Sequence, residues 1–380
     1  MRIALVHDYL SDFGGAERVL KVLSEMYPEA PIYTAFYKEG TVVAKEFSGK
    51  TVIESKWAWL LKRGNLYSPL RFLLPWIWGG MDLSAYDLVI TSCSGYIARG
   101  FRMRADARLI AYCHTPPRFL YGLQTSFDWQ RHWYTRMYAA VVNHFLRVFD
   151  AESAQRVDRW LVNSENVRAR VKKFYRRTAT VVYPPVEVEK IKMSAKGVDK
   201  EDYFLIVSRL VGAKGLEEAA LAAHKLGFDL WIAGEEGGIA GISQRLLMLG
   251  SGSVKLLGRV DDNELYKLYA GAKGFIALAR NEDFGMTVVE ALAAGTPVLA
   301  YAGGGFLETV RDGETGVFIT KTTVDEIGRG MRRLEEISWS KRVLTAWVDQ
   351  FSRMKFEEKI KAIVKEETEN ARTSRSRDNQ

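Results

Sequence analysis

The chain has 380 residues, too many for one ordinary domain and enough for two. Its two cysteines, Cys93 and Cys113, argue against a disulfide scaffold and fit a reducing compartment. The net charge of +8 would suit nucleic acid, an acidic ligand or a membrane surface. We find no nucleic-acid-binding motif, and the first residues, MRIALVHDYL, follow a strand pattern rather than that of a secretory signal. We therefore expect a cytoplasmic protein whose partners do not include nucleic acid.

Strand-like and helix-like runs alternate along the first half of the chain, a pattern typical of parallel α/β sheets. We expect helices to begin after Gly15 and after Ser164, the second with serine as its N-cap. The alternation stops at residues 182–186 (VYPPV), where two prolines indicate a linker. The expected strands of this half are residues 3–6, 32–36, 88–91, 109–112 and 160–162.

A second series of the same kind begins at residue 204. Helical patterns follow it over residues 324–364, and the polar tail TENARTSRSRDNQ has too little apolar content to fold by itself. Two such series joined by a proline linker predict two Rossmann-like domains that face a central cleft. The expected strands of the second half are residues 204–207, 230–233, 254–257, 275–278, 298–301 and 317–319.

Two carboxylates lie eight residues apart in NEDFGMTVVEALAAGTPV, residues 281–298. Glu282 follows an apolar strand, and we expect Glu290 in the first turn of the next helix. Gly285, between them, allows a ligand to approach the backbone closely, and the N–H groups of a helix start attract phosphate. The arrangement suits a phosphorylated ligand with sugar hydroxyls at both ends, which is a nucleotide-sugar. Taken alone, Glu290 could simply be an acid favoured by the helix dipole.

Basic residues follow the first strand of the second series. Ser208, Arg209 and Lys214 stand at its carboxyl end, where ligands of open α/β sheets bind. An Arg fork and a Lys point charge can hold a diphosphate and stabilise it as a leaving group, although a solvated basic loop is the alternative. The sequence has no carboxylate cluster with metal-ligand spacing. We therefore expect no metal or cofactor besides the donor.

Two further strand ends carry candidate groups in the first half. Gly14 and Gly15 (FGGAERVL) form either a plain tight turn or a loop over phosphates, and no complete G-x-G-x-x-G supports a dinucleotide dehydrogenase. His114 precedes a rigid TPP loop and is either a structural histidine or a functional one. Asp8 is a possible carboxylate on the acceptor side.

Residues 56–80 (KWAWLLKRGNLYSPLRFLLPWIWGG) are the compositional outlier, with four of the ten tryptophans. Charges and prolines interrupt the segment, so it does not span a membrane, but it suits insertion among lipid headgroups. A basic run at residues 167–177 would add attraction to anionic lipid. Core packing, an oligomer contact and a solvated helix face are the alternatives. The expected membrane contacts are Trp57, Trp59, Trp76, Trp78, Arg63 and Arg71.

The motif Glu-x7-Glu, with EDFG before it and EALAAGTPV after it, resembles the retaining glycosyltransferases of family 4, which have the GT-B fold. SRLVGAKG, AGEEGG, LLGRVDDNELYKLYAGA and GGGFLETVRDGETGVFI extend the resemblance over the second half. VHDYLSDFGGAERVL, CHTPPRFLY and VNSENVRARVKKFY are similar to the mannosyltransferases of bacterial and archaeal cell-surface polysaccharide and glycolipid assembly. The resemblance thus covers nearly the whole chain.

The resemblance also implies a domain organisation. It assigns residues 1–185 to an acceptor-binding domain and residues 186–349 to a domain that binds the nucleotide-sugar. A last helix, with 356–367 as the candidate, crosses back so that residues 350–367 pack on the first domain. We expect residues 368–380 to be disordered.

The resemblance assigns roles residue by residue. His114 would contact the transferred sugar and form the catalytic group with Glu282, Arg209 and Lys214, while the last two take the place of Mg²⁺. Glu290 would hold the ribose hydroxyls and Glu282 the sugar hydroxyls. The expected donor-binding residues are Gly14, Gly15, Ser208, Arg209, Lys214, Gly258, Arg259, Val260, Glu282, Asp283, Phe284, Gly285, Met286, Thr287 and Glu290. The expected acceptor-side residues are Asp8, Tyr9 and Arg118.

The resemblance predicts transfer of mannose from GDP-mannose, with retention, to a lipid-linked saccharide or glycolipid. The enzyme would act as a peripheral protein at the anionic inner face of the cytoplasmic membrane. One alternative is another donor, a UDP-sugar of glucose, galactose or N-acetylglucosamine. An epimerase or hydrolase on a related fold would need a second acid or base that we cannot name. A nucleotide-sugar-binding protein without turnover is the alternative outside enzymes.

Overall fold

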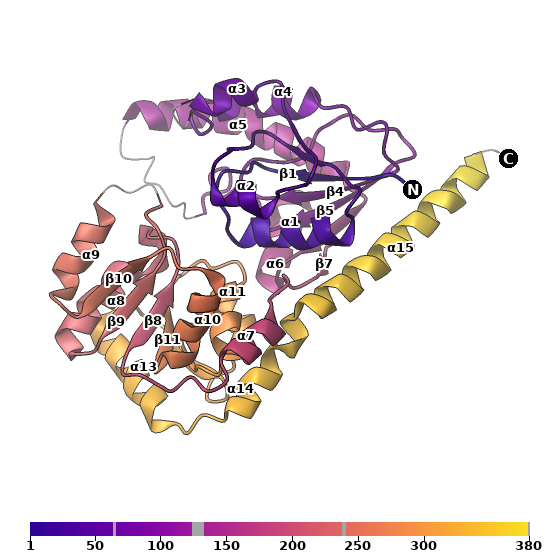
Figure 1. The fold of residues 1–380 in the computed structure, drawn as a ribbon. Coiled ribbons are helices and arrows are strands. Elements are labelled where there is room, and N and C mark those ends of the chain that lie inside the picture. The colour runs from indigo at the N-terminus through magenta and orange to yellow at the C-terminus, as the bar shows by residue number, and fades with distance from the viewer. Residues whose placement is uncertain (64–65, 124–132, 238–240, 379–380) are drawn as a thin grey trace. The chain divides into compact units, whose positions relative to one another are not determined.

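The computed structural model describes residues 1–63, 66–123, 133–237 and 241–378. The described residues form two compact units (Figure 1). The first unit contains residues 1–123, 133–185 and 354–378, and the second contains residues 186–353. The chain passes between them at Pro185 and again at Arg353.

The first unit is built on a parallel sheet with the strand order β3-β2-β1-β4-β5-β6-β7. The expected strands are confirmed, and the two that the sequence did not predict are the short edge strands β3 and β7. The neighbours β1 and β4 lie at the point where the strand order reverses, which is where ligands of such sheets bind. The strands are β1 (Ile3–His7), β2 (Ile32–Thr34), β3 (Val52–Glu54), β4 (Leu88–Cys93), β5 (Arg108–Cys113), β6 (Arg159–Val162) and β7 (Thr180–Val181).

Alternate residues of this sheet serve two cores, because successive side chains of a strand point to opposite faces. Ala4 and Val6 of β1 join the core that Leu146 of α5 and Val167 of α6 complete. Leu5 joins the core on the opposite face. The Ser164 hydroxyl caps α6 by accepting the Val167 N–H at 3.1 Å, as the sequence predicted. The helices are α1 (Gly15–Met26), α2 (Val42–Glu46), α3 (Ala58–Leu61), α4 (Leu74–Gly79), α5 (Trp133–Gln155) and α6 (Glu165–Tyr175), with a 3-10 turn η2 (Arg71–Leu73).

The second unit has a parallel sheet with the order β10-β9-β8-β11-β12-β13. Its strand order reverses between β8 and β11. The strands are β8 (Phe204–Val207), β9 (Leu230–Ala233), β10 (Val254–Gly258), β11 (Gly274–Ala277), β12 (Val298–Tyr301) and β13 (Gly316–Ile319). The helices are α7 (Val188–Ser194), η4 (Gly212–Lys214), α8 (Leu216–Leu226), α9 (Ile242–Gly250), α10 (Asp262–Gly271), α11 (Met286–Ala293), α12 (Phe306–Thr309), α13 (Val324–Glu336), α14 (Lys341–Trp347) and η5 (Val348–Phe351).

The last helix, α15 (Arg353–Asp378), returns the chain to the first unit (yellow in Figure 1). Phe356, Ile360 and Val364 are buried beside Leu5 and other residues of that unit, so the predicted crossing helix is confirmed. The sequence predicted disorder from residue 368 onward, whereas α15 continues to Asp378. Adding a residue to an existing helix costs far less than nucleating one, which accounts for the extension into polar sequence.

Candidate functional site

The strongest candidate site of the second unit lies where its strand order reverses. Lys214 follows β8 in the turn η4, and Glu282 follows β11. The Lys214 Nζ lies 2.6 Å from the Glu282 Oε2, and each side chain is between a fifth and a third exposed. Two predicted site residues that are 68 positions apart in the sequence are therefore brought into an ion pair that solvent reaches.

Glycines shape the turn that carries Glu282. Gly285 has a φ of +93°, and a Cβ there would lie 2.8 Å from the Phe306 ring. Gly305 donates its N–H to the Glu282 carbonyl at 2.9 Å, and a Cβ on Gly304 would lie 2.3 Å from the same oxygen. Side chains at these positions would force the turn apart. Sequence reasoning anticipated Gly285 and missed the support from Gly304 and Gly305, although the run of three glycines was a visible signal.

Glu290 lies in the second turn of α11, not in the first as predicted, because the helix begins at Met286. Only 7% of the residue is exposed, and the hydroxyl of the buried Tyr269 donates a hydrogen bond of 2.7 Å to its Oε2. A buried carboxylate requires such partners. The helix dipole favours acids in the first turn, so it does not explain this one. No motif in the sequence pointed to Tyr269, which is contributed by α10.

The loops after β8, β9 and β10 are joined at the same edge of the sheet. Gly234 donates its N–H to the Gly258 carbonyl at 2.8 Å, and a Cβ on Gly234 would lie 1.9 Å from the Ser208 carbonyl. Arg209 is exposed, and Arg259 pairs with Glu235 at 3.4 Å. Predicted donor-binding residues from the ends of β8, β10 and β11 therefore share one edge. The remaining ones there are Val260 after β10 and Asp283, Phe284, Met286 and Thr287 around the start of α11.

A chain of polar side chains, buried except at Glu17, occupies the equivalent edge of the first unit. The Ser92 Oγ lies 2.8 Å from the His114 Nε2 and 3.1 Å from the His7 Nδ1. The His7 Nε2 lies 3.3 Å from the Glu17 Oε1, and the Gly14 N–H donates to the Glu17 Oε2 at 2.8 Å. The chain thus links predicted His114 to the predicted loop of Gly14 and Gly15. Sequence reasoning missed Ser92 and Glu17, although Glu17 stands at the N3 position of a capping box.

Burial controls the charges in this chain. Burial lowers the pKa of His114 to about 3, and the neighbouring His7 adds to the shift, so the ring of His114 is neutral at physiological pH. Burial raises the pKa of Glu17, but the hydrogen bond and the charge of His7 outweigh it and the net pKa is lowered. The site of the first unit therefore combines a neutral imidazole with an ionised carboxylate.

The acceptor-side candidates differ in their surroundings. Asp8 is 3% exposed, and its carboxylate accepts hydrogen bonds of 2.8 to 3.1 Å from the N–H groups of Ser94, Tyr96 and Ala98. These contacts favour a structural role, in which Asp8 holds the loop after β4. Tyr9 stacks on a core phenylalanine, and Arg118 is half-buried in the loop after His114.

The tryptophan-rich segment separates into buried and exposed residues. Trp78 is 0% exposed and donates its Nε1–H to the Tyr96 carbonyl at 2.8 Å, so its prediction as a membrane contact is wrong. Trp57 packs against the same core. Trp59 and Trp76 are each 61% exposed. Of the two predicted arginines, Arg63 lies over the Trp59 ring, and Arg71 lies over the rings of Phe119 and Tyr138.

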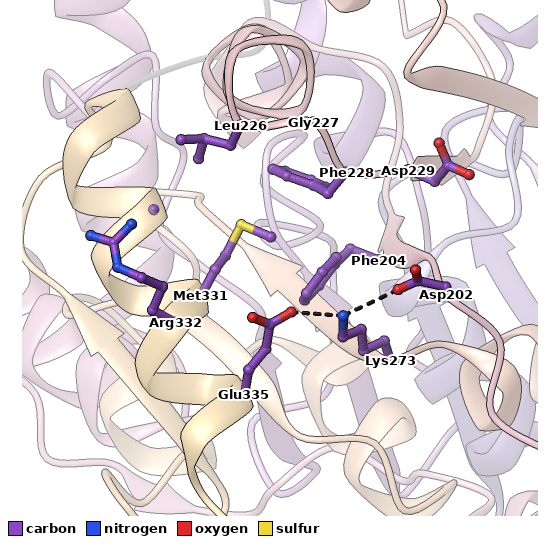
Figure 2. Close-up of a pocket in the computed structure, with 11 residues that line it drawn as sticks. Asp202, Phe204, Leu226, Gly227, Phe228, Asp229, Lys273, Met331, Arg332 and Glu335 are labelled. Atoms are coloured by element: carbon purple, nitrogen blue, oxygen red, sulfur yellow. Dashed lines mark hydrogen bonds and ion pairs between the residues drawn. The ribbon is translucent and has the colours of Figure 1, made fainter.

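A pocket of about 440 Å³ lies at the opposite edge of the second sheet (Figure 2). Its residues include Asp202, Asp229 and Lys273, which precede β8, β9 and β11 respectively. Lys273 bridges Asp202 at 3.1 Å and Glu335 at 2.7 Å. Ligands of parallel sheets bind at the carboxyl ends of the strands, so we assign this pocket a structural role.

Two features are absent from the described part of the chain. No group of three or more His, Cys, Asp or Glu side chains there is arranged to hold a metal ion. None of the helices described is both long enough and apolar enough to cross a membrane.

Comparisons with known proteins agree with this geometry. The family described as "Glycosyltransferase Family 4" matches residues 13–190, and the one described as "Glycosyl transferases group 1" matches residues 187–343. Together the two matches cover residues 13–343, which contain the candidate residues of both units apart from His7, Asp8 and Tyr9. The chain belongs to the family 4-type glycosyltransferases, which have the GT-B fold.

Individual relatives are distant. An uncharacterized glycosyltransferase of Methanocaldococcus jannaschii is 32% identical over 141 residues, which is 36% of each chain. Mannosylfructose-phosphate synthase of Agrobacterium fabrum is 31% identical over 93 residues, 24% of this chain and 20% of that one. These matches thus span about a third or less of the curated relatives' lengths. The Anabaena protein HepE in complex with UDP-glucose has a TM-score of 0.69 and 18% identity, with 96% of this chain and all of the other covered.

Proposed function

We propose that this protein is an active retaining glycosyltransferase that takes its sugar from a nucleotide-sugar. The observation that carries the proposal is the ion pair between Lys214 and Glu282 at the point where the strand order reverses. The buried Glu290 lies in α11, the helix that follows Glu282. A cation for the diphosphate and carboxylates for hydroxyls are the groups that such a donor requires. Family membership supports the same conclusion.

The proposed roles follow from charge and exposure. The exposed Arg209 and the partly exposed Lys214 stabilise the diphosphate as it leaves, Glu282 binds hydroxyls of the transferred sugar, and Glu290 binds those of the ribose. In the first unit His114, neutral at physiological pH, contacts the transferred sugar, as the family resemblance implies. Because the clamp is made of side-chain cations, we propose that the reaction needs no metal ion.

The identity of the donor is the finer part of the proposal. The resemblance of the N-terminal motifs favours GDP-mannose, and the name of the Agrobacterium relative also refers to a mannosyl product. UDP-glucose is the second candidate, because the structurally similar HepE was solved in complex with it. The nucleotide base distinguishes these two donors more readily than the sugar does, because calorimetry can measure the binding of GDP and UDP without an acceptor.

We also propose that the acceptor is a lipid-linked saccharide or glycolipid and that the enzyme works at the inner face of the cytoplasmic membrane. The exposed Trp59 and Trp76 support this location, since large rings at a surface suit the headgroup region. A membrane location places the enzyme where such an acceptor is concentrated.

Isothermal titration of the full chain with GDP, UDP and ADP tests the donor proposal. We expect binding of GDP, or of UDP if the second candidate is correct, and weaker binding after Glu290→Gln. Lys273→Ala is the matched control, because Lys273 lies at the opposite edge of the same sheet. A variant that binds as tightly as the wild type would remove Glu290 from the site, and failure of all three nucleotides to bind would overturn the proposed function.

Turnover separates an enzyme from a nucleotide-sugar-binding protein. The bound nucleotide identifies the sugar donors to assay, and release of that nucleoside diphosphate in the presence of lipid extract reports transfer. Release that depends on the extract would support the proposal. Tight binding without release in any extract would favour the non-catalytic alternative.

A further inference from the structure

The helix α5 of the first unit carries a row of exposed apolar side chains. Residues of this size and polarity are normally buried, and a contiguous group of them on a surface marks an interaction site. The row consists of Trp133 (68% exposed), Tyr134 (55%), Met137 (62%), Val141 (60%), Phe145 (67%) and Val148 (47%).

The row forms one face of the helix. Met137, Val141 and Phe145 follow one another at intervals of four, which places them on the same side. Ala139, Asn143, Leu146 and Asp150 are buried on the side that packs on the first unit. The helix therefore has one apolar side in the core and a second one in solvent, so core packing does not account for the second.

The surface continues onto neighbouring elements. Tyr138 borders the row, and its hydroxyl donates to the Pro69 carbonyl while its ring lies 5.3 Å from the Arg71 guanidinium. Phe72, the residue after Arg71, is 40% exposed, and Trp76 of α4 is 61% exposed. The helices α4 and α5 pack side by side in the first unit (Figure 1).

The two stretches of sequence that carry this surface contain basic residues and no acid, although Lys62 pairs with Glu54 of β3 at 2.8 Å. No Asp or Glu occurs in residues 55–81 or in residues 129–149. The first acid of α5, Asp150, is buried and paired with Arg99. The basic residues of the two stretches are Lys56, Lys62, Arg63 and Arg71 in the first and Arg131, Arg136 and Arg147 in the second.

This charge pattern selects between two occupants. In a symmetric dimer the same patch would face itself, so arginines such as Arg136 would meet arginines with no carboxylate opposite. An anionic lipid surface offers negative headgroups to the arginines and an acyl boundary to the aromatic rings. We propose that the exposed face of α5, with Phe72 and Trp76 beside it, docks the protein on an anionic membrane surface. This membrane surface deepens the proposed function and rests on it, because a lipid-linked acceptor gives the membrane location its purpose. Vesicle binding itself can be tested without that function.

Co-sedimentation of the full chain with phosphatidylcholine vesicles, with and without phosphatidylglycerol, tests the surface. We expect binding only when phosphatidylglycerol is present, and weaker binding in high salt, because salt screens the attraction. The double variant Met137→Ser, Phe145→Ser should bind at least about tenfold more weakly. Arg136→Glu should weaken binding through charge alone.

The matched control is Met193→Ser, Met248→Ser, which changes two equally exposed apolar residues of the second unit (68% and 80%). It should bind vesicles like the wild type. All proteins are also titrated with GDP and UDP, whose proposed site lies in the second unit, and their sedimentation equilibrium is measured. Loss of vesicle binding with nucleotide binding kept supports the proposal whichever nucleotide binds.

Three results would overturn the proposal. They are a wild type that does not bind anionic vesicles, an α5 variant that binds as well as the control, and a wild type that is a dimer where the α5 variant is a monomer. The last outcome would assign the face to a second copy of the chain. None of the three depends on whether a nucleotide binds, so failure here is distinguishable from failure of the proposed function.

Discussion

The two units fix their candidate groups in different ways. In the first unit a chain of side chains, from the partly exposed Glu17 through the buried His7 and Ser92, holds His114. In the second unit glycines allow backbone segments to touch, so that the carbonyl of Glu282 accepts from Gly305. The first unit depends on polar partners for its geometry, whereas the turn that carries Glu282 in the second depends on the absence of side chains.

This difference determines which substitutions are informative. Removing a polar partner in the first unit leaves a buried group without its hydrogen bond, which costs stability. Adding a methyl group to a glycine such as Gly304 in the second unit displaces the turn that carries the Glu282 carboxylate. Partly exposed charges such as Lys214 can be removed with little effect on folding, because their ion pairs are partly solvated.

The largest effect is expected at the cationic clamp. Lys214→Ala and Arg209→Ala should each lower turnover by roughly 10²- to 10³-fold, because one donor to a developing charge contributes about 3 kcal/mol. Steady-state release of nucleoside diphosphate measures this, with circular dichroism to check the fold. Lys273→Ala, which loses its ion pairs at the other edge of the sheet, is the control. Near-normal rates for both clamp variants would remove these residues from the mechanism.

Gly304→Ala should lower turnover by about a hundredfold, because a Cβ 2.3 Å from the Glu282 carbonyl displaces the turn. Gly313→Ala is matched to it, since both glycines have positive φ (+59° and +77°), but the nearest atom to a Cβ at Gly313 is in the flexible Arg333 side chain, at 3.8 Å. Each change should cost about 1 kcal/mol of stability through the backbone alone. Equal turnover in the two variants would contradict the role of close packing at Glu282.

The neutral His114 predicts a pH dependence of stability. Its pKa is about 3 in the folded protein against an ordinary 6.5, so the unfolded chain takes up the proton first. The free energy of unfolding should therefore decrease as the pH falls below 6.5, by up to about 1.4 kcal/mol per pH unit, and this loss would end near pH 3. Urea unfolding at pH 6.5 and pH 5 should show a loss of about 2 kcal/mol that is absent from His114→Gln. The same loss in both proteins would show that this ring is not the source.

Chelation should have the smallest effect. The clamp of Arg209 and Lys214 provides the positive charge, so turnover in excess EDTA should match that in buffer. Activity that is lost on chelation and restored by Mg²⁺ or Mn²⁺ would contradict the clamp and favour a metal-assisted leaving group.

The strands and the linker of this fold were predictable from sequence because they depend on local patterns. Apolar runs such as residues 204–207 and 298–301 match the observed strands residue for residue. The edge strands β3 and β7 were missed because two or three residues are too few to form a pattern. The helical extension of α15 was missed because composition alone does not show that a helix is already nucleated upstream.

The candidate site was predictable where motifs lie at strand ends, as for His114, Lys214 and Glu282. It was not predictable where distant segments meet. The hydrogen bond from Tyr269 to Glu290 joins two helices, and Ser92 lies 22 residues before His114. No spacing rule connects these positions, because their contact depends on strand order.

The sequence by itself determined the α/β class, the two-unit organisation and the residue types available for a nucleotide-sugar, because periodicity and strand-end motifs are local properties. Only the tertiary structure decided which residues of the same type are buried and which are exposed. Trp76 and Trp78 are two positions apart, yet one is 61% exposed and the other 0%, since residues two positions apart in a helix point to nearly opposite sides, here to solvent and to the core. The exposed face of α5 could likewise be identified only from the structure, because burial depends on packing between segments and not on composition.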